Sequence, residues 1–299
     1  MVKLKRKQKK ELADKELTAF RSLLRQNSVY PKKRLGQTFL YKGIIADEIV
    51  RRAQITPDDV VVEIGPGLGA LTFALAEKGA PVIALEYDSE LAGILQRTVT
   101  RKNVEVLRVD ALHYDYERLY NQHKVKLKII GNLPYYLTTP LIFTLLSLHP
   151  FIQSMLVMIQ KEVADRITAQ PGTKNYGTIS IFAQLHCAIS QQLTVTSDCF
   201  YPIPQVDSEV VAFTFREKPA VDIGDEETFE HLVRASFAKR RKTLLNALKG
   251  ANYLNRTREK IVAALERAEI DPSRRPETLS IAEFSTICTN IVSDKMIKS

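Results

Sequence analysis

The chain has 299 residues, enough for one large or two modest domains with a sizeable hydrophobic core. Apolar residues make up 45% of the chain and charged residues 26%, which excludes a disordered or fibrous protein. Its three cysteines (Cys187, Cys199 and Cys288) lie far apart, which argues against a disulfide framework or a zinc site and favours the reducing cytoplasm.

The net charge of +9 is concentrated at the N-terminus. Residues 1–34 contain 12 Lys or Arg and 3 Asp or Glu, so the remainder of the chain has equal numbers of basic and acidic residues. Residues 1–27 are predicted to form a charged, partly helical extension. It is either a solvated tail or an arm that binds phosphates.

From about residue 31 to 216 the sequence pattern alternates between strands and helices, which predicts an α/β fold with a mostly parallel sheet. The predicted strands are 60–64, 82–85, 104–109, 127–130, 155–159, 193–196 and 210–215. The predicted helices between them are 68–78, 88–98, 140–148 and 161–169. Strands this apolar need helices on both faces of the sheet.

Residues 129–160 lack Lys, Arg, Asp and Glu, and are long enough in principle to span a membrane. Gly131, Asn132 and three prolines divide this stretch into short pieces. A buried strand, loop and helix are therefore predicted instead of a transmembrane segment.

After about residue 216 the pattern is helical only, with amphipathic segments at 226–239, 242–251, 257–268 and 281–292. The predicted domains are the extension 1–27, an α/β domain 28–206 whose last strand can extend to 216, and a helical domain 217–299.

The stretch VVVEIGPGLGALT (60–72) runs from a buried strand through Gly65, Gly67 and Gly69 into a helix. Glycines let the backbone turn sharply and approach a ligand closely. The spacing is neither the GxGxxG dinucleotide motif nor a P-loop. A nucleotide-type loop is favoured, and a purely structural turn is the alternative.

Two acidic residues follow the next two strands. Glu86 can accept hydrogen bonds from both hydroxyls of a ribose, and Asp110 can accept from the exocyclic amine of an adenine. The loop and the two carboxylates would meet at the carboxyl edge of the sheet. This set fits an adenosine cofactor without a pyrophosphate, which indicates S-adenosylmethionine.

The sequence Asn132-Leu133-Pro134-Tyr135 follows the fourth strand. The amine N6 of adenine is a poor nucleophile, because its lone pair is delocalised. The Asn132 side-chain oxygen and the Leu133 carbonyl can accept its two N–H groups and direct the lone pair at a methyl group. Tyr135 can stack on a flipped or single-stranded base. The alternative is an Asn-x-Pro turn with a packed tyrosine.

Nine basic residues and one acid lie between positions 234 and 260 of the helical region. Such a run can be a solvated helix face, but this one stands out in a neutral background. It predicts contacts with nucleic-acid phosphates. The predicted nucleic-acid-binding residues are Arg234, Lys239, Arg240, Arg241, Lys242 and Lys249.

Taken in order, these motifs resemble the small-subunit ribosomal RNA adenine N6,N6-dimethyltransferases over roughly residues 30–285. The matching segments are LGQTFL (35–40), EIGPGLGALT (63–72), NLPY (132–135), FYPIPQVDS (200–208), RKTLLNAL (241–248) and RPETLS (275–280). The related antibiotic-resistance methylases of large-subunit RNA share the core motifs, but the helical tail motifs favour the small-subunit branch.

The resemblance implies a Rossmann-like, seven-stranded methyltransferase domain with a smaller helical C-terminal domain. It also implies dimethylation of two adjacent adenines near the 3′ end of the RNA, coupled to small-subunit assembly. The implied cofactor-binding residues are Thr38, Leu40, Glu63, Gly65, Gly67, Glu86, Asp110 and Asn132, with Glu63 supporting the loop. Phe200 is implied to stack on the base together with Tyr135.

One position departs from the family motif. The family usually has GQNFL, with the Asn touching the cofactor, where this chain has Thr38. Loss of the amide puts that single contact in doubt.

No metal and no strong general base are expected. The expected partner is small-subunit RNA in an immature particle, and the enzyme is expected to be a cytoplasmic monomer without membrane contact. Two alternatives stay open, a nucleic-acid-binding protein that has lost the activity and a small-molecule methyltransferase.

Overall fold

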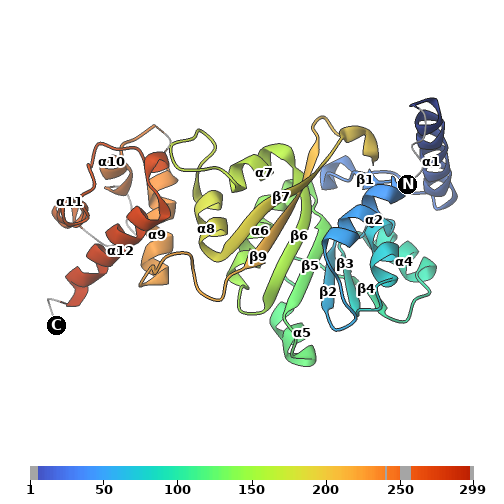
Figure 1. The fold of residues 1–299 in the computed structure, drawn as a ribbon, viewed down its shortest axis with the longest axis horizontal. Helices are drawn as coiled ribbons and strands as arrows, with labels where there is room; N and C mark the ends of the chain where they lie inside the picture. Colours follow the sequence, from blue (N-terminus) through green and yellow to red (C-terminus); the bar gives the residue numbers. More distant parts are fainter. Residues whose placement is uncertain (1–5, 240, 250–256, 297–299) are drawn as a thin grey trace. The chain divides into compact units, whose positions relative to one another are not determined.

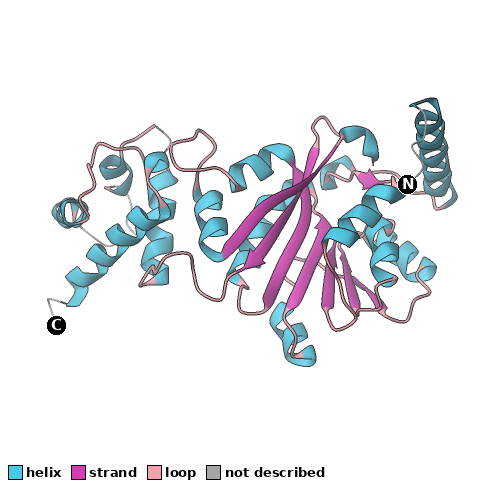
Figure 2. Ribbon diagram, viewed as in Figure 1, coloured by secondary structure: helices cyan, strands magenta, loops and turns pink. Residues whose placement is uncertain are grey.

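The computed structural model describes residues 6–239, 241–249 and 257–296. Strands and helices alternate up to residue 215, and helices alone follow (Figure 1 and Figure 2). The strands are β1 (Phe39–Leu40), β2 (Val60–Ile64), β3 (Val82–Glu86), β4 (Val104–Arg108), β5 (Leu127–Asn132), β6 (Ile152–Gln160), β7 (Cys187–Val195), β8 (Phe200–Tyr201) and β9 (Ser208–Phe215).

The helices are α1 (Arg6–Gln26), α2 (Gly43–Arg52), α3 (Ala70–Ala76), α4 (Ser89–Thr98), α5 (Tyr116–His123), α6 (Thr138–Ser147), α7 (Lys161–Ile167), α8 (Thr178–His186), α9 (Glu226–Phe237), α10 (Leu244–Leu248), α11 (Arg258–Arg267) and α12 (Ile281–Met296). Short 3-10 turns are η1 (Lys33–Leu35), η2 (Tyr135–Leu137), η3 (Ser197–Cys199) and η5 (Pro276–Thr278). The predicted alternation of strands and helices is confirmed.

Seven strands form one sheet in the order β4-β3-β2-β5-β6-β9-β7. The pairs from β4 to β6 are parallel, and β9 runs antiparallel to β6. Every residue of β2 and β3 is buried, which requires a layer of side chains on each face of the sheet. The predicted seven-stranded, mostly parallel sheet is confirmed.

The uncharged stretch 129–160 is divided among β5, α6 and β6. Its strands lie inside the sheet, and α6 buries Leu141, Ile142 and Leu145. The described helices include none that is both long enough and apolar enough to cross a membrane.

The edge strand β7 is longer than the 193–196 segment predicted from the sequence. Most of its nine residues are exposed or half-buried, including the polar run Ser190, Gln191 and Gln192. An edge strand forms ladder bonds on one side only and does not need an apolar run. The hydrophobic pattern therefore underestimated its length.

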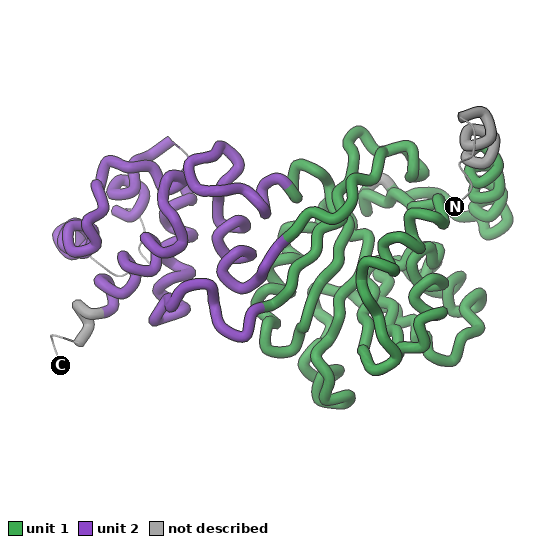
Figure 3. The backbone as a smooth tube through the Cα atoms, viewed as in Figure 1, with its two compact units in different colours: residues 1–164, 190–215 green, residues 165–189, 216–299 purple. Residues whose placement is uncertain are grey.

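The chain divides into two compact units, shown in green and purple in Figure 3. The first contains residues 1–164 and 190–215, and the second contains residues 165–189 and 216–299. Residues 165–189 thus belong to the helical unit, whereas the sequence boundary places them in the α/β domain. The reason is α8, whose Ile181 and Leu185 are part of the core of the helical unit.

In the helical unit, α9 to α12 each bury one face. Phe229 and Leu232 of α9 pack in the same apolar cluster as Phe284 and Ile287 of α12. The amphipathic helices predicted at 226–239, 257–268 and 281–292 are confirmed. The helix predicted at 242–251 is shorter, since α10 spans Leu244–Leu248, and residues 250–251 lie outside the described residues.

The helix α1 belongs to the first unit. Its Leu24 packs with Phe39 of β1 and with Leu91 and Ile94 of α4, and Phe20 lies at the edge of the same cluster. The C-terminal half of the predicted extension is therefore a packed element of the α/β unit.

Candidate active site

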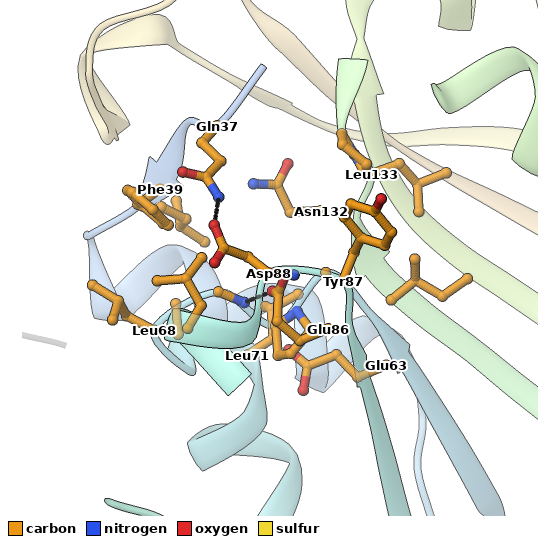
Figure 4. A pocket seen from close by; sticks show the side chains of 18 of the residues that line it. Gln37, Phe39, Glu63, Leu68, Leu71, Glu86, Tyr87, Asp88, Asn132 and Leu133 are labelled. Carbon is orange, nitrogen blue, oxygen red and sulfur yellow. Dashed lines mark hydrogen bonds between the residues drawn. The ribbon is translucent and has the colours of Figure 1, made fainter. Parts of the chain in front are cut away.

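A cavity of about 320 Å³ lies where β2, β3 and β5 end and their loops begin (Figure 4). Ten of the predicted site residues line it, namely Thr38, Leu40, Glu63, Gly65, Gly67, Glu86, Asp110, Asn132, Leu133 and Pro134. The carboxyl edge of a parallel sheet is the usual ligand site of such folds. The structure brings these residues together as the sequence predicted.

The glycine loop contacts the third strand through its backbone. Gly67 has a φ of +58°, and its N–H donates to an Oε of Glu86 at 3.0 Å. A Cβ at position 67 would lie 3.2 Å from the ring of Phe39. A side chain here would strain the backbone and crowd the cavity wall, so the sequence uses glycine.

Glu86 ends β3 and has 7% of its surface exposed. Its second oxygen accepts the N–H of Asp88 at 2.8 Å. Burial raises the pKa of Glu86, although the two backbone donors act in the opposite direction. Each carboxylate oxygen can accept more than one hydrogen bond, so Glu86 retains acceptor capacity toward the cavity.

Glu63 lies on β2 and is 1% exposed. Burial and the nearby Glu86 carboxylate raise the pKa of Glu63 to about 8. Its Oε2 has no hydrogen-bond partner among the described residues. Glu63 is thus a protonated carboxylic acid near neutral pH, at the base of the glycine loop.

Asp110 follows β4 and is partly exposed. One oxygen accepts the N–H of Leu112 at 2.9 Å, and the other lies 3.1 Å from Nδ1 of His113. These contacts hold the carboxylate at the cavity rim, next in the sheet to Glu86.

The Asn132 side chain extends from the end of β5 toward the cavity (Figure 4). Its Nδ2 donates to the backbone carbonyl of Thr38 at 3.2 Å. Its Oδ1 is buried and has no partner among the described residues. An unpaired buried acceptor costs about 1–3 kcal/mol, which points to a donor that arrives with a ligand.

Hydrogen bonds to β6 and to the start of α6 hold the rest of the NLPY loop in place. The Leu133 N–H donates to the carbonyl of Met158 in β6 at 3.0 Å. The Pro134 carbonyl accepts from the Leu137 N–H and from the Thr138 hydroxyl at the start of α6. The loop is therefore a rigid support for Asn132.

Close packing explains the glycine before this loop. A Cβ at Gly131 would lie 2.4 Å from the carbonyl oxygen of Ile64 in the adjacent strand β2. Position 131 must therefore be glycine for β2 and β5 to pair at their carboxyl ends.

The two predicted stacking residues lie outside the described cavity wall. The Tyr135 hydroxyl is 3.2 Å from Oγ of Ser208, which fixes its ring. Phe200 is 0% exposed, pairs with Leu40 between β8 and β1, and packs in the core. Its ring has no free face, so the structure does not support the predicted stacking of Phe200 on a base. Tyr136 lines the cavity instead and is 47% exposed.

Sequence reasoning missed several residues of the cavity wall. Gln37 and Asp88 line the cavity and are hydrogen-bonded to each other, and Phe20 and Leu23 come from α1. The spacing Glu86-x-Asp88 and the apolar positions of the N-terminal helix were the available signals.

The predicted basic residues lie in and near the α9–α10 connection of the helical unit. Lys239, Arg241, Lys242 and Lys249 are exposed, whereas Arg240 lies outside the described residues. Arg234 forms an ion pair with Glu230 at 2.6 Å and lies over the ring of Phe182.

In the described ranges, His, Cys, Asp and Glu form no group of three or more that could hold a metal ion.

Known proteins that resemble this chain belong to the family that the motifs of the site indicate. Residues 30–291 match the profile of the family described as ribosomal RNA adenine dimethylase. A relative from Pelotomaculum thermopropionicum, named ribosomal RNA small subunit methyltransferase A, is 43% identical over 91% of this chain and 95% of its own length. A relative of the same name from Latilactobacillus sakei is 42% identical over 94% of this chain and 96% of its own length.

Among solved structures, a dimethyladenosine transferase from Plasmodium falciparum superposes with a TM-score of 0.74 and 26% identity, covering 86% of this chain and 98% of that one. The 23S rRNA methyltransferase ErmE shares the fold, with a TM-score of 0.61 and 23% identity over 85% of this chain and 99% of that one. The resemblance seen in the motifs is confirmed. The chain belongs to the ribosomal RNA adenine dimethylase family and is a methyltransferase that uses S-adenosyl-L-methionine.

Proposed function

We propose that this enzyme transfers two methyl groups to N6 of each of two adjacent adenines near the 3′ end of small-subunit ribosomal RNA during subunit assembly. The observation that carries the proposal is the buried Asn132 oxygen, which faces the cavity and accepts no hydrogen bond from the part of the chain that the structure describes. The name shared by the relatives supports small-subunit RNA as the substrate.

The residues of the cavity fit the cofactor. Glu86 and Asp110 follow adjacent strands and offer carboxylate acceptors. We assign Glu86 to the ribose hydroxyls and Asp110 to the adenine amine of the cofactor. Gly65 and Gly67 provide backbone without side chains, and Glu63 supports their loop. When bound, the cofactor supplies a sulfonium methyl group for transfer.

Thr38 fits the proposed cofactor site although the family motif usually has Asn at this position. Its backbone carbonyl, which every amino acid provides, accepts from Asn132. Thr38 lines the cavity together with Leu40, so both stay in the proposed cofactor site. The orientation of Asn132 does not depend on the side chain at position 38.

Asn132 and Leu133 act on the substrate amine. The Asn132 oxygen accepts one N–H and the Leu133 carbonyl the other, so the N6 lone pair becomes localised toward the methyl group. Pro134 stiffens the backbone between them and the base-stacking Tyr135, whose ring Ser208 holds. Proton loss is easy once N6 is alkylated and positively charged, so no strong base is needed.

The exposed basic residues of the helical unit bind RNA phosphates, and the enzyme works as a monomer. Its compartment is the reducing cytoplasm. This placement is supported by the names of the relatives, which give a ribosomal RNA as the substrate.

The test is transfer of tritiated methyl groups to three substrates: unmethylated small ribosomal subunits, naked small-subunit RNA and free adenosine. We expect incorporation into the subunits, as N6,N6-dimethyladenosine at two adjacent positions. Incorporation into free adenosine alone would make the protein a small-molecule methyltransferase. Binding to the subunits with no incorporation would favour an assembly factor without activity.

A further inference from the structure

Asp88 is a buried carboxylate that none of the roles above explains. Its side chain is 4% exposed and lies just beyond β3, two residues after Glu86. Lys32 donates to both of its oxygens, at 2.8 and 2.7 Å. Asp88 is shielded from water while the Lys32 side chain is 33% exposed, so solvent screens this ion pair less than a pair between two surface residues.

Gln37 joins the same cluster (Figure 4). Its Nε2 donates to Oδ2 of Asp88 at 2.9 Å, and its Oε1 accepts the backbone N–H of Lys32 at 2.8 Å. Asp88 is therefore bonded to both ends of a short loop that starts at Lys32 and ends at Gln37. These hydrogen bonds to a buried carboxylate restrain the loop, because a shift of its backbone would strain or break them.

The next residue, Thr38, holds Asn132. Its carbonyl accepts from Asn132 Nδ2 and thereby directs Oδ1 into the cavity. Residues 32–38 thus connect the end of β3, through Asp88, to the end of β5, through Asn132. Without the Thr38 carbonyl in place, nothing in the described contacts would favour one orientation of the Asn132 carboxamide over its flipped form.

We infer that Asp88 is a positioning residue for methyl transfer, because it fixes residues 32–38 so that the Thr38 carbonyl orients the Asn132 carboxamide. This inference rests on the proposed role of Asn132. Asp88 touches neither the base nor the methyl group in this scheme and acts through the loop alone.

The charge state of Asp88 agrees with this role. Burial opposes ionisation, but hydrogen bonds from Lys32 and Gln37 hold the pKa of Asp88 below its ordinary value. Asp88 also caps α4, since Oδ1 accepts the N–H of Glu90 at 3.1 Å. Asn is as good a cap as Asp, so Asp88→Asn removes the buried charge and keeps the helix start.

The experiment is a double-mutant cycle between Asp88→Asn and Asn132→Ala, measured as single-turnover methyl transfer to unmethylated small ribosomal subunits. Both substrates are saturating, and calorimetry sets the cofactor concentration for each variant. We expect Asp88→Asn to slow transfer by about tenfold or more in the natural background, since small misplacements of a reacting group have effects of this size. In the Asn132→Ala background we expect almost no further loss.

Asp198→Asn is the matched control, because it also removes an Asp–Lys ion pair, with Lys42 at 2.6 Å, on a residue outside the described cavity wall. It should leave the transfer rate unchanged. Gln37→Met is the second variant, which loses both side-chain hydrogen bonds and keeps the chain length. It should reproduce the Asp88→Asn result, also if Asp88→Asn proves too unstable to assay.

The outcomes separate the two claims. If Asn132→Ala alone transfers methyl groups at the natural rate, the proposed role of Asn132 fails, and the role of Asp88 fails with it. If Asn132→Ala is slow but Asp88→Asn and Gln37→Met are at the natural rate, only the positioning role is overturned. Equal losses from Asp88→Asn in both backgrounds would also overturn it, because the effect would then not pass through Asn132.

Discussion

The Asn132 carboxamide has one N–H bonded to the protein and a buried oxygen that is unpaired. A carboxamide is suited to this arrangement, because its donor can be fixed by the scaffold while its acceptor serves the substrate. The unpaired oxygen destabilises the free enzyme slightly and is satisfied when the amine binds. Because its bond to the amine strengthens as the N6 lone pair becomes localised in the transition state, the benefit should appear mainly in the chemical step.

Replacing Asn132 by Ala should slow single-turnover methyl transfer by about 100-fold or more at saturating RNA and cofactor, as expected for loss of one preorganised hydrogen bond in a transition state.

Tyr135→Phe, which keeps the ring, should remain substantially active. Tyr135→Ala should bind the flipped adenine more weakly, by about 1–3 kcal/mol. Equal rates for Tyr135→Ala and the natural enzyme at subsaturating RNA would argue that Tyr135 does not stack.

The raised pKa of Glu63 predicts how the stability of the folded protein depends on pH. Its pKa is about 8 in the folded protein against an ordinary value of 4.5, so the folded state binds the proton more tightly than the unfolded state. Its contribution to stability is therefore present below pH 4.5 and is lost as the pH rises toward 8.

In calorimetry without cofactor, the Tm of the natural protein should fall between pH 5 and pH 8.5 by several degrees more than that of Glu63→Gln, whose amide does not titrate. Parallel Tm curves for the two proteins would mean that Glu63 is not a buried titrating acid.

At the scale of the element, the charged N-terminal segment forms the helix α1, which contributes side chains to the cavity wall. Phe20 and Leu23 line the cavity, and Phe20 lies 6.1 Å from the ring of Phe39, centroid to centroid. Arg21 lies over the ring of Tyr201 at 5.3 Å. Over residues 14–26, the helix thus directs Phe20 and Leu23 toward the cavity, while Asp14, Lys15 and Arg25 are exposed, as in other amphipathic helices.

The double variant Phe20→Ala, Leu23→Ala should weaken cofactor binding by about tenfold, because apolar surface that covers the ligand is lost. Calorimetric titration with S-adenosylmethionine measures the effect. Leu17→Ala is the control, since Leu17 lies on the same helix outside the described cavity wall. If both proteins bind the cofactor equally well, α1 does not cover the ligand.

At the scale of the molecule, chemistry and RNA binding are assigned to different units. The cavity lies in the unit formed by residues 1–164 and 190–215. The exposed cluster Lys239, Arg241 and Lys242 lies in the other unit. Phosphate contacts position an RNA without reading its sequence, so this cluster should affect affinity and leave the cofactor site unchanged.

Replacing Lys239, Arg241 and Lys242 by Ala should weaken RNA binding and reduce the slope of log K against log salt by about 2 to 3, as expected for three phosphate contacts. Cofactor affinity should not change. The triple variant Arg51→Ala, Arg101→Ala, Lys102→Ala removes the same charge from the first unit. An equal loss of slope in both triple variants would indicate a general charge effect.

Much of the site was readable from the sequence, because its residues follow successive parallel strands. Gly65, Glu86, Asp110 and Asn132 each come at or just after a strand of the sheet, and parallel strands bring their carboxyl ends to one edge. Local hydrophobic pattern alone determines such strand ends. The family motifs also indicated the reaction and the cofactor.

Tertiary structure decided what local pattern does not encode. The bond from Thr38 to Asn132 spans 94 positions, and the bond from Lys32 to Asp88 spans 56. Phe200 is an apolar residue in a motif, and only three-dimensional packing shows that its ring is enclosed in the core. The sequence by itself thus determined which groups reach the sheet edge. The fold decided which of them face the cavity, because contacts between distant segments depend on how the whole chain packs.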